Sequence, residues 1–436
     1  MIDIALIREN PEEFAKRIAT KVVDVPIDDI LRLDELRRNL ITDVERIKAE
    51  RNAGSKLVGK TKDPEERNRL IAEMKDLGDT ITETDERIRQ TEAELTELLL
   101  GIPNLPDEDV PVGADETANV VASTGGPERE LDFTPRPHWE IAEELGIIDF
   151  ERGVKLAGTR GYVLKGDGAR LQRALIQWML DVHTTRHGYS EVDPPYQVLS
   201  EMLVGTGQLP KFADTLFHDA EEDKWLIPTA EVPVTNMYRD EILPGDQLPI
   251  YHVAATPSFR REQISAGRDV RGIKRVYQFM KVELVKFVTP EESANELGRL
   301  MDEALYIVDQ LGLKYRVLDL STGDMTFGSA HTYDIEAWAP GSNEWLEISS
   351  CSNMRDFQAR RANLKFRPDG GGRPQFLHTL NGSGLALPRV IIAIIENYQR
   401  PDGTIEVPEV LRGYFGERDT IGKQPPAGPS KHEADA

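Results

Sequence analysis

The chain has a single cysteine, Cys351, among its 436 residues. One thiol can build neither an internal disulfide framework nor a cysteine-rich zinc site, so both are excluded. Long apolar runs are missing as well: the densest, Val390 to Ile395, is far shorter than the roughly 20 residues of a membrane span. The first residues, from Met1 to Ile4, lack the basic segment and apolar core of a secretory signal. We therefore expect a cytoplasmic protein without a membrane segment.

Positive charge is also scarce, with 53 basic against 76 acidic residues and a net charge of −23. Long-range repulsion therefore opposes non-specific binding to a polyanion. Residues 46–69 depart from this balance, because their basic side chains outnumber the acidic ones. These basic residues are Arg46, Lys48, Arg51, Lys56, Lys60, Lys62, Arg67 and Arg69. A local basic patch in a negative chain favours specific contacts with phosphates.

A regular apolar repeat runs over residues 70–98, at alternating intervals of four and three residues. Its members are Leu70, Met74, Leu77, Ile81, Thr84, Ile88, Thr91, Leu95 and Leu98. This spacing is typical of a coiled-coil seam. Asp63 and Pro64 supply a cap and a first-turn proline for the helix. A less regular seam precedes it over residues 33–47, with a turn predicted over residues 54–60, so residues 28–100 should form an antiparallel helical hairpin.

The basic patch falls at and around the predicted tip of this hairpin, whereas the base is acidic. A solvated arm with no partner, or a coil that only dimerises, would explain the helices but not this distribution of charge. We therefore predict that the tip of the hairpin binds nucleic-acid phosphates. The hairpin and its flanks make an N-terminal domain of residues 1–110.

The rest of the chain mixes helical and strand patterns without a regular βα alternation. This mixture favours an α+β domain, which we place at residues 111–418. A linker rich in proline, glycine and aspartate opens it. Residues 419–436 are predicted to be a disordered tail, since proline, glycine and polar residues dominate there.

Two predicted strands carry unusual polar side chains. In a strand over residues 275–288, alternation places Arg275, Phe279 and Glu283 on one face. Phe279 and Glu283 would lie about 13 Å apart, the reach of an adenylate from its base to its amino-acid end. Arg260 and Glu262 share a face of the preceding strand, and a guanidinium is suited to phosphate. A solvated sheet face with a cross-strand ion pair is the open alternative.

Two further segments offer ligand-binding groups. Glu347 with Ser349 or Ser350 provides oxygen ligands suited to Mg²⁺, and Ser350 would require a bulge or a strand end. The glycines of residues 381–384 permit close backbone approach to a ligand, before a helix that begins at Arg389. An ordinary loop is the alternative for this last segment.

Taken together, these segments resemble the bacterial-type seryl-tRNA synthetase family of class II aminoacyl-tRNA synthetases. The matching motifs are Gly205 to Pro210, Thr229-Ala230-Glu231, Phe259-Arg260-Arg261-Glu262, Gln278 to Glu283, Glu347 to Asn353, and Asn381 to Leu385. The resemblance covers nearly all of the chain except its tail. It implies an antiparallel catalytic sheet flanked by helices. It also implies a homodimer whose N-terminal arm grips tRNA(Ser) across the two subunits.

The resemblance assigns roles to individual residues. Arg260 and Arg389 would be catalytic. The ATP-binding residues would be Arg260, Arg261, Glu262, Arg275, Val276, Phe279, Glu347, Ile348, Ser349, Ser350 and Arg389. Serine would be bound by Thr229, Ala230, Glu231, Arg260, Glu283 and Ser383, and Mg²⁺ by Glu347 and Ser350, with no zinc. The implied reactions are formation of seryl-adenylate from L-serine and ATP, then transfer of serine to tRNA(Ser), and to tRNA(Sec) where present.

Three places depart from the family pattern: Arg261 stands where a small residue is common, His331 often is a lysine, and Gln263-Ile264 replaces smaller residues. The rival interpretations are a synthetase for another amino acid, a ligase that loads a carrier protein, and a non-catalytic coiled-coil scaffold or RNA-binding relic. The basic tip of the hairpin argues against the carrier ligase, and the joint presence of the site residues argues against the scaffold.

Overall fold

The computed structural model describes residues 1–262 and 271–424, so the predicted departure at Gln263-Ile264 lies outside the described residues. The chain divides into two compact units, Met1–Pro103 and Asn104–Ala436. The boundary predicted at residue 110 is too late. The Asn104 side chain donates hydrogen bonds to the carbonyls of Gly328 (2.9 Å) and Met354 (2.8 Å), and Val110 packs in an apolar cluster of the second unit. These bonds tie residues 104–110 to the second unit.

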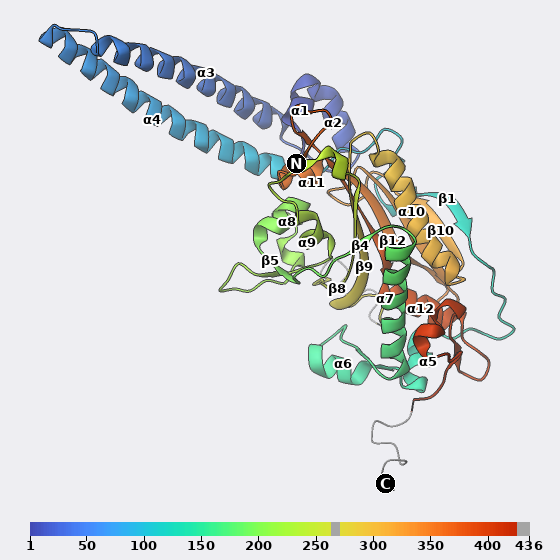
Figure 1. The fold of residues 1–436 in the computed structure, drawn as a ribbon. Helices are drawn as coiled ribbons and strands as arrows, with labels where there is room; N and C mark the ends of the chain where they lie inside the picture. Colours follow the sequence, from blue (N-terminus) through green and yellow to red (C-terminus); the bar gives the residue numbers. More distant parts are fainter. Residues whose placement is uncertain (263–270, 425–436) are drawn as a thin grey trace. The chain divides into compact units, whose positions relative to one another are not determined.

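The first unit is helical throughout its regular structure (Figure 1). Its helices are α1 (Ile4–Glu9), α2 (Pro11–Ala19), α3 (Ile27–Val58) and α4 (Pro64–Leu100). Helices α3 and α4 pack against each other as an antiparallel hairpin. At roughly 1.5 Å per residue, the 37 residues of α4 span roughly 55 Å.

The predicted seam of this hairpin is confirmed. Every predicted seam position of α4 is buried or half-buried, and Leu33, Leu40 and Val44 of α3 are buried opposite. The predicted cap is also confirmed, since the Asp63 carboxylate accepts hydrogen bonds from the backbone N–H groups of Glu65 (2.9 Å) and Glu66 (3.0 Å). Burial of the apolar stripe, rather than helix propensity alone, stabilises helices of this length.

The predicted turn over residues 54–60 is wrong in its extent. Helix α3 continues through Gly54 to Val58, and the connection is the short segment 59–63. Gly54 has a packing role instead, because a Cβ there would lie 2.3 Å from the Met74 sulfur. The glycine lets the two helices approach at this level, so it serves the seam rather than the turn.

The second unit is built on an eight-stranded sheet with the order β1-β10-β11-β12-β15-β9-β8-β4. Its strands are β1 (Val120–Gly125), β10 (Tyr315–Asp319), β11 (His331–Ala339), β12 (Glu344–Arg355), β15 (His378–Ala386), β9 (Gln278–Val288), β8 (Ile250–Phe259) and β4 (Ser190–Glu191). All neighbouring strands pair antiparallel except β4 with β8, which are parallel. The predicted α+β class with an antiparallel sheet is confirmed.

Helices cover the sheet and bury its apolar side chains. The longer ones are α5 (His138–Leu145), α6 (Phe150–Ala157), α7 (Asp167–Thr185), α10 (Ser293–Gln310) and α12 (Leu387–Asn397). The shorter ones are α8 (Ser200–Thr206), α9 (Glu231–Asn236) and α11 (Phe357–Arg361). The main core joins α7, α10 and α12 to the sheet, and a second cluster joins α9 and α11 to β8 and β9. The central strands are therefore fixed by packing on both sides.

Short elements complete the second unit. The strands are β2 (Ile148–Asp149), β3 (Val163–Leu164), β5 (Gln197–Val198), β6 (Trp225–Leu226), β7 (Ile242–Pro244), β13 (Lys365–Arg367), β14 (Gln375–Phe376), β16 (Ile405–Glu406) and β17 (Thr420–Ile421). Pairing of β17 with β16 shows that the predicted tail begins too early, because Ile421 is buried in the main core. Residues 425–436 lie outside the described part. Among the described helices, none has the length and apolar content required to cross a bilayer.

Candidate active site

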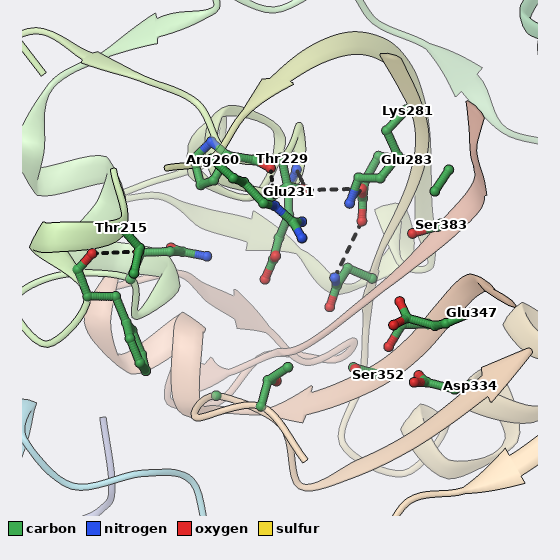
Figure 2. A pocket seen from close by; sticks show the side chains of 18 of the residues that line it. Thr215, Thr229, Glu231, Arg260, Lys281, Glu283, Asp334, Glu347, Ser352 and Ser383 are labelled. Atoms are coloured by element: carbon green, nitrogen blue, oxygen red, sulfur yellow. Dashed lines mark hydrogen bonds and ion pairs between the residues drawn. The ribbon is translucent and has the colours of Figure 1, made fainter. Parts of the chain in front are cut away.

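One cavity of about 770 Å³ opens beside the central strands of the second unit (Figure 2). Most of the predicted site residues line it: Thr229, Glu231, Arg260, Glu262, Arg275, Val276, Phe279, Glu283, Glu347, Ser350, Ser383 and Arg389. They come from segments more than a hundred residues apart in the sequence, which the sheet brings together.

The side chains of four other predicted residues do not line the cavity. Ala230 and Ile348 belong to the apolar cores. Ser349 is buried, and its hydroxyl donates to the Ser383 carbonyl at 2.6 Å. Arg261 is exposed, with its guanidinium 5.8 Å from the ring centre of Phe217. Each lies beside a lining residue in the sequence, but its side chain points elsewhere.

Strand β9 supplies one wall of the cavity. Phe279 and Glu283 line the cavity from the same face of the strand, as predicted, and Lys281 lies between them. Val282 and Leu284 point into the core. The strand begins at Gln278, so Arg275 and Val276 reach the cavity from the segment before it rather than from a strand beginning at residue 275.

Arg260 and Glu262 do not share a strand face, because β8 ends at Phe259. Glu262 has φ 49°, a left-handed conformation that turns the chain sharply. The Arg260 guanidinium instead lies 5.3 Å from the ring centre of Phe279, within cation–π range. A flat aromatic surface and a guanidinium therefore face each other at one wall of the cavity.

Strand β12 contains the bulge that the use of Ser350 requires. Ile335 of β11 pairs with Ser349 while the next residue pairs with Glu347, so Ile348 is the extra residue. The bulge puts Glu347 and Ser350 on the same side, where both line the cavity. Arg389 is held beside them, since it donates to the Glu347 backbone carbonyl (2.8 Å) and pairs with its carboxylate (3.1 Å).

The glycines of residues 381–384 lie in strand β15, which excludes the alternative of an ordinary loop. A Cβ on Gly382 would lie 3.1 Å from the Cys351 sulfur, and one on Gly384 would lie 3.0 Å from a Val282 methyl group. These glycines make room for the core rather than for a ligand. Ser383, between them, lines the cavity.

Buried polar groups gather around two carboxylates, Glu231 and Glu283 (Figure 2). The Thr229 hydroxyl donates to Glu283 at 3.0 Å and accepts from the Glu231 backbone N–H at 3.2 Å. Lys281 forms an ion pair with Glu283, and the Asn381 amide donates to it at 3.4 Å. Two carboxylates, a hydroxyl and an amide in so small a space suit a small polar molecule that carries an ammonium group.

Burial raises the pKa of Glu231 from its ordinary 4.5 to about 7, and the negative charge of Glu283 adds to the effect. The folded protein therefore binds this proton more tightly than the unfolded chain does. The contribution of Glu231 to the unfolding free energy therefore falls as the pH rises from 4.5, its ordinary pKa, to about 7, its pKa in the folded protein. Ionised Glu231 is thus destabilising until a ligand compensates its charge.

We expect Glu231→Gln to raise the unfolding free energy at pH 8 by about 1–3 kcal/mol, since the amide removes the buried charge. At pH 5 the gain should nearly vanish, because the carboxyl of the native protein is then protonated in the folded state. Urea unfolding at both pH values measures the difference. Glu201→Gln, at an exposed glutamate, is the matched control. An equal gain at both pH values would contradict this account.

Sequence reasoning missed Asp334, and it gave no role to Lys281 or Asn381 although both lie in the matched motifs; all three line the cavity. Asp334 pairs across strands with Ser350 and lies near Glu347 (Figure 2). Burial, and then the charge of Glu347, raises the pKa of the Asp334 carboxyl well above its ordinary value. Its Oδ1 accepts no hydrogen bond from the described residues. Since strand register sets this position, no local sequence signal could have found it.

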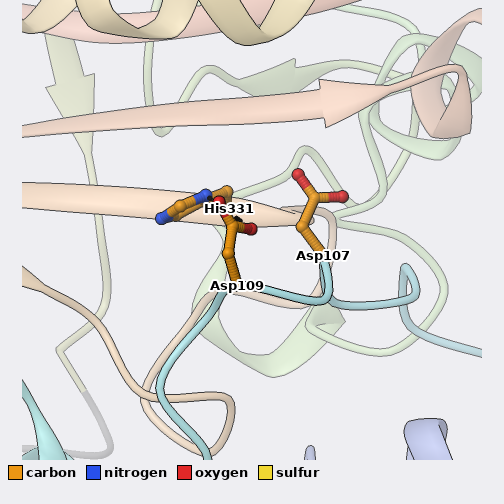
Figure 3. Close-up of side chains that lie close together, drawn as sticks. All are labelled: Asp107, Asp109 and His331. Atoms are coloured by element: carbon orange, nitrogen blue, oxygen red, sulfur yellow. Dashed lines mark ion pairs between the residues drawn. The ribbon is translucent and has the colours of Figure 1, made fainter.

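His331, a predicted departure, lies outside the cavity beside Asp107 and Asp109 (Figure 3). Its Nε2 is 3.0 Å from Asp319 and its Nδ1 is 3.7 Å from Asp109. Burial alone would lower the pKa of His331, but the hydrogen bond and charge of Asp319 raise it overall. Arg355 already pairs with Asp107 at 2.6 Å. These pairings favour a hydrogen-bonded cluster of His331 and Arg355 with the surrounding carboxylates over a metal centre.

Comparison with known proteins agrees with this geometry. Residues 1–106 match the seryl-tRNA synthetase N-terminal domain, and residues 213–398 match the class II tRNA synthetase core domain of the G, H, P, S and T type. A serine–tRNA ligase of Thermomicrobium roseum is 60% identical over 425 residues, covering 98% of this chain and 96% of that protein. One of Chloroflexus aurantiacus is 57% identical, covering 97% of this chain and all of that protein.

A solved structure gives the same result at greater distance. The seryl-tRNA synthetase of Pyrococcus horikoshii, complexed with ATP, is similar with a TM-score of 0.91 and 35% identity, covering 98% of this chain and 100% of that one. Similarity over both domains favours a serine–tRNA ligase over the carrier-ligase and scaffold alternatives. The chain belongs to the seryl-tRNA synthetase family of class II, ATP-dependent enzymes that join serine to tRNA.

Proposed function

We propose that the cavity of Figure 2 carries out both steps of the serine–tRNA ligase reaction. One observation carries this assignment: Arg260, Arg389, Phe279 and the carboxylates of Glu231 and Glu283 converge on a single cavity. The first step joins serine to the α-phosphate of ATP. The second passes the seryl group to tRNA(Ser).

The buried carboxylates are the proposed serine site. The ammonium group of serine is a cation, and Glu283 is the buried carboxylate that Thr229 and Asn381 orient by hydrogen bonds. The serine hydroxyl would donate to Glu231, with Ser383 completing the wall. An amino acid without the hydroxyl would leave buried polar groups unpaired, which costs enough binding free energy to reject alanine.

The opposite side of the cavity is the proposed ATP site. Adenine would stack on the Phe279 ring, with Glu262 accepting from the base. Arg260 and Arg389, with Arg275 as a further candidate, would meet the phosphates, since guanidinium groups donate paired hydrogen bonds to phosphate oxygens. The ATP complex of the Pyrococcus horikoshii relative and the AMP complex of the Naegleria fowleri relative (31% identical, TM-score 0.86) support nucleotide binding here.

A Mg²⁺ ion fits the oxygen groups of Glu347 and Ser350, with Asp334 beside them. The carboxylates of Asp334 and Glu347 are neighbours, and the buried Asp334 has one oxygen without a hydrogen bond among the described residues. A cation between them would stabilise this grouping, so the residues fit Mg²⁺. Bound there, Mg²⁺ would supply positive charge to the phosphates of ATP. Exchange activity that persists in excess EDTA would contradict this part of the proposal.

The chemistry requires no side-chain nucleophile. A serine carboxylate oxygen attacks the α-phosphorus in line, and pyrophosphate leaves. The terminal ribose hydroxyl of tRNA then attacks the seryl carbonyl carbon, and AMP leaves. The protein acts by positioning the reactants and by stabilising the charge that develops on the phosphate with Arg260 and Arg389.

The hairpin of the first unit is the proposed tRNA-binding element. Ion pairs engage three of its predicted basic residues: Arg46 with Glu50, Lys48 with Asp85, and Arg69 with Glu66. The other five, Arg51, Lys56, Lys60, Lys62 and Arg67, are exposed and form no ion pair within the described residues. These five cluster toward the tip, where phosphates can be bound without first breaking a salt bridge.

Family resemblance also supports a cytoplasmic homodimer whose arm binds tRNA across subunits, and activity on tRNA(Sec) where that tRNA occurs. Sedimentation velocity tests the homodimer, and a monomer-sized species at micromolar concentration would contradict it. Charging assays with purified tRNA(Sec) test activity on that tRNA, and no seryl transfer would exclude it.

Serine-dependent ATP–pyrophosphate exchange tests the proposed function directly. We expect exchange with serine, and a kcat/KM for alanine that is lower by about 10³-fold or more, because the unpaired polar groups oppose it. Threonine keeps the hydroxyl and adds a methyl group, so its kcat/KM measures how far the shape of the cavity excludes a larger side chain. Exchange that is equal with serine and alanine, or absent with serine, would contradict the assignment.

A further inference from the structure

A chain of buried hydrogen bonds reaches Glu231 of the proposed serine site from the protein interior, on the side away from the cavity. The Thr379 hydroxyl donates to the Gln358 side-chain oxygen at 2.6 Å, and the Gln358 amide nitrogen donates to the Glu231 carboxylate at 2.6 Å. All three side chains are buried, with exposed fractions of 0%, 1% and 6% in that order. Glu231 lines the cavity, whereas Gln358 and Thr379 do not. Whatever Gln358 contributes to the substrate therefore passes through Glu231.

The neighbours of Gln358 fix the direction in which its amide points. A side-chain amide has one oxygen acceptor and one nitrogen with two N–H donors. The Thr206 carbonyl and the ionised Glu231 carboxylate can only accept, so the nitrogen must face them, at 3.3 Å and 2.6 Å, and the Thr379 hydroxyl donates to the oxygen. A flipped amide would set its oxygen against the carboxylate and lose both bonds. The amide is thus a donor of fixed direction, supported by three separate elements.

Charged groups around Glu231 act in opposite directions. Glu283 opposes its ionisation, while Lys281 and Arg260 favour it. Lys281 pairs with Glu283, and Arg260 is placed to meet the nucleotide. Gln358 is the neighbour whose side chain donates a hydrogen bond to Glu231, and this bond lowers the pKa of the carboxyl against the effect of burial. Without it, more of the carboxyl would be protonated at neutral pH.

We infer that Gln358 is a positioning residue for serine specificity, holding the Glu231 carboxylate in the orientation that accepts the substrate hydroxyl. Thr379 supports it by donating a hydrogen bond to the amide oxygen, which helps to hold the side chain in place. The inference rests on the proposed role of Glu231 in serine binding. Gln358 itself touches neither substrate nor nucleotide, so its effect should be confined to serine.

The variant Gln358→Met keeps the length of the side chain and removes the donor. We expect the KM for serine in ATP–pyrophosphate exchange to rise by about 10- to 50-fold, because a charge-assisted hydrogen bond to a buried carboxylate is lost. The KM for ATP should stay within about 2-fold, a split that general loss of packing would not give. The acidic limb of kcat/KM for serine should move to higher pH, because the pKa of Glu231 rises when the hydrogen bond is lost.

Two variants separate positioning from stability. Gln399 is buried to a similar extent, and its amide donates to the carbonyls of Arg136 (3.1 Å) and Glu396 (2.8 Å) away from the cavity. Gln399→Met should lower the melting temperature comparably and leave the KM for serine and the pH profile unchanged. Thr379→Val should change the KM for serine in the same direction as Gln358→Met, by about 3- to 5-fold, because the amide loses one of its two anchors.

Glu231→Ala distinguishes failure of this inference from failure of the proposed function. If Glu231→Ala raises the KM for serine strongly but Gln358→Met leaves both that KM and the pH profile unchanged, the positioning role is overturned and the serine site stands. If Glu231→Ala has no effect on serine, the proposed site itself is wrong. Equal changes in the KM values for serine and ATP in Gln358→Met would also overturn the inference, since they would show a structural role alone.

Discussion

Replacing Arg260 with alanine should lower kcat/KM for serine-dependent ATP–pyrophosphate exchange by about 10³-fold, the usual scale for losing a charged group that stabilises a transition state. The guanidinium lies over the Phe279 ring at the wall of the cavity, where, in the proposed site, the α-phosphate of ATP would gain negative charge during transfer. Steady-state exchange at saturating ATP and serine would show most of the loss in kcat. Arg260→Lys should recover only part of it, because an ammonium group does not donate the paired hydrogen bonds of a guanidinium.

Arg261 provides the matched control, one residue along the chain and with the same charge. Its side chain is exposed and lies over Phe217 outside the cavity. Arg261→Ala should therefore change exchange by no more than about 3-fold, the range of surface substitutions. A large loss in Arg261→Ala together with a small one in Arg260→Ala would contradict the placement of both residues.

Shortening the hairpin should abolish tRNA charging while leaving serine activation intact. Removing residues 45–58 and 64–77 takes two heptads from each helix, so the seam stays in phase and the arm loses roughly 21 Å. The connecting segment keeps Lys60 and Lys62, but the other six residues of the basic patch are removed with the two heptads, so the arm loses length and charge together. We expect kcat/KM for tRNA charging to fall by at least about 10²-fold, since several phosphate contacts are lost together. Exchange should stay within about 2-fold.

Charge variants in the full-length arm separate the effect of its length on tRNA charging from the effect of its basic side chains. Changing Lys56, Lys60 and Lys62 together to glutamine should lower kcat/KM for charging by about 10- to 30-fold and weaken its dependence on salt. The same change at Arg46, Lys48 and Arg69, which already pair with carboxylates, should have a smaller effect. Equal effects of the two sets, or loss of exchange in the shortened arm, would contradict the division of labour between the units.

Features that depend on neighbours in the sequence could be predicted well. The heptad seam and the Asp63 cap need only side chains three or four residues apart, and the structure has both. The face of β9 that carries Phe279 and Glu283 follows from alternation alone. The extent of the turn could not be predicted in this way. Gly54 lies within helix α3, where the lack of a side chain leaves room for Met74 of helix α4.

Features that depend on strand register could not be predicted from the residues alone. The bulge at Ile348 decides whether Ser349 or Ser350 faces the cavity, and it arises from the pairing of β12 with β11. Asp334 enters the site through the same pairing, more than ten residues from Glu347 in the sequence. Family resemblance indicated Ser350 correctly, but it also led to Ala230, Ile348 and Ser349, whose side chains point away. Sequence proximity to a site residue is thus no guide to where a neighbouring side chain lies.

The one thiol of the chain has a practical consequence for experiments on the arm. Cys351 has an exposed fraction of 0% beneath Gly382, and burial raises its pKa to about 12. Only thiolates react readily with maleimides, so the folded enzyme should give almost no background labelling. A cysteine introduced at an exposed position of the tip, such as Ser55, would then carry a fluorophore or spin label alone. Motion of the arm during capture of tRNA can be followed without first engineering a cysteine-free protein.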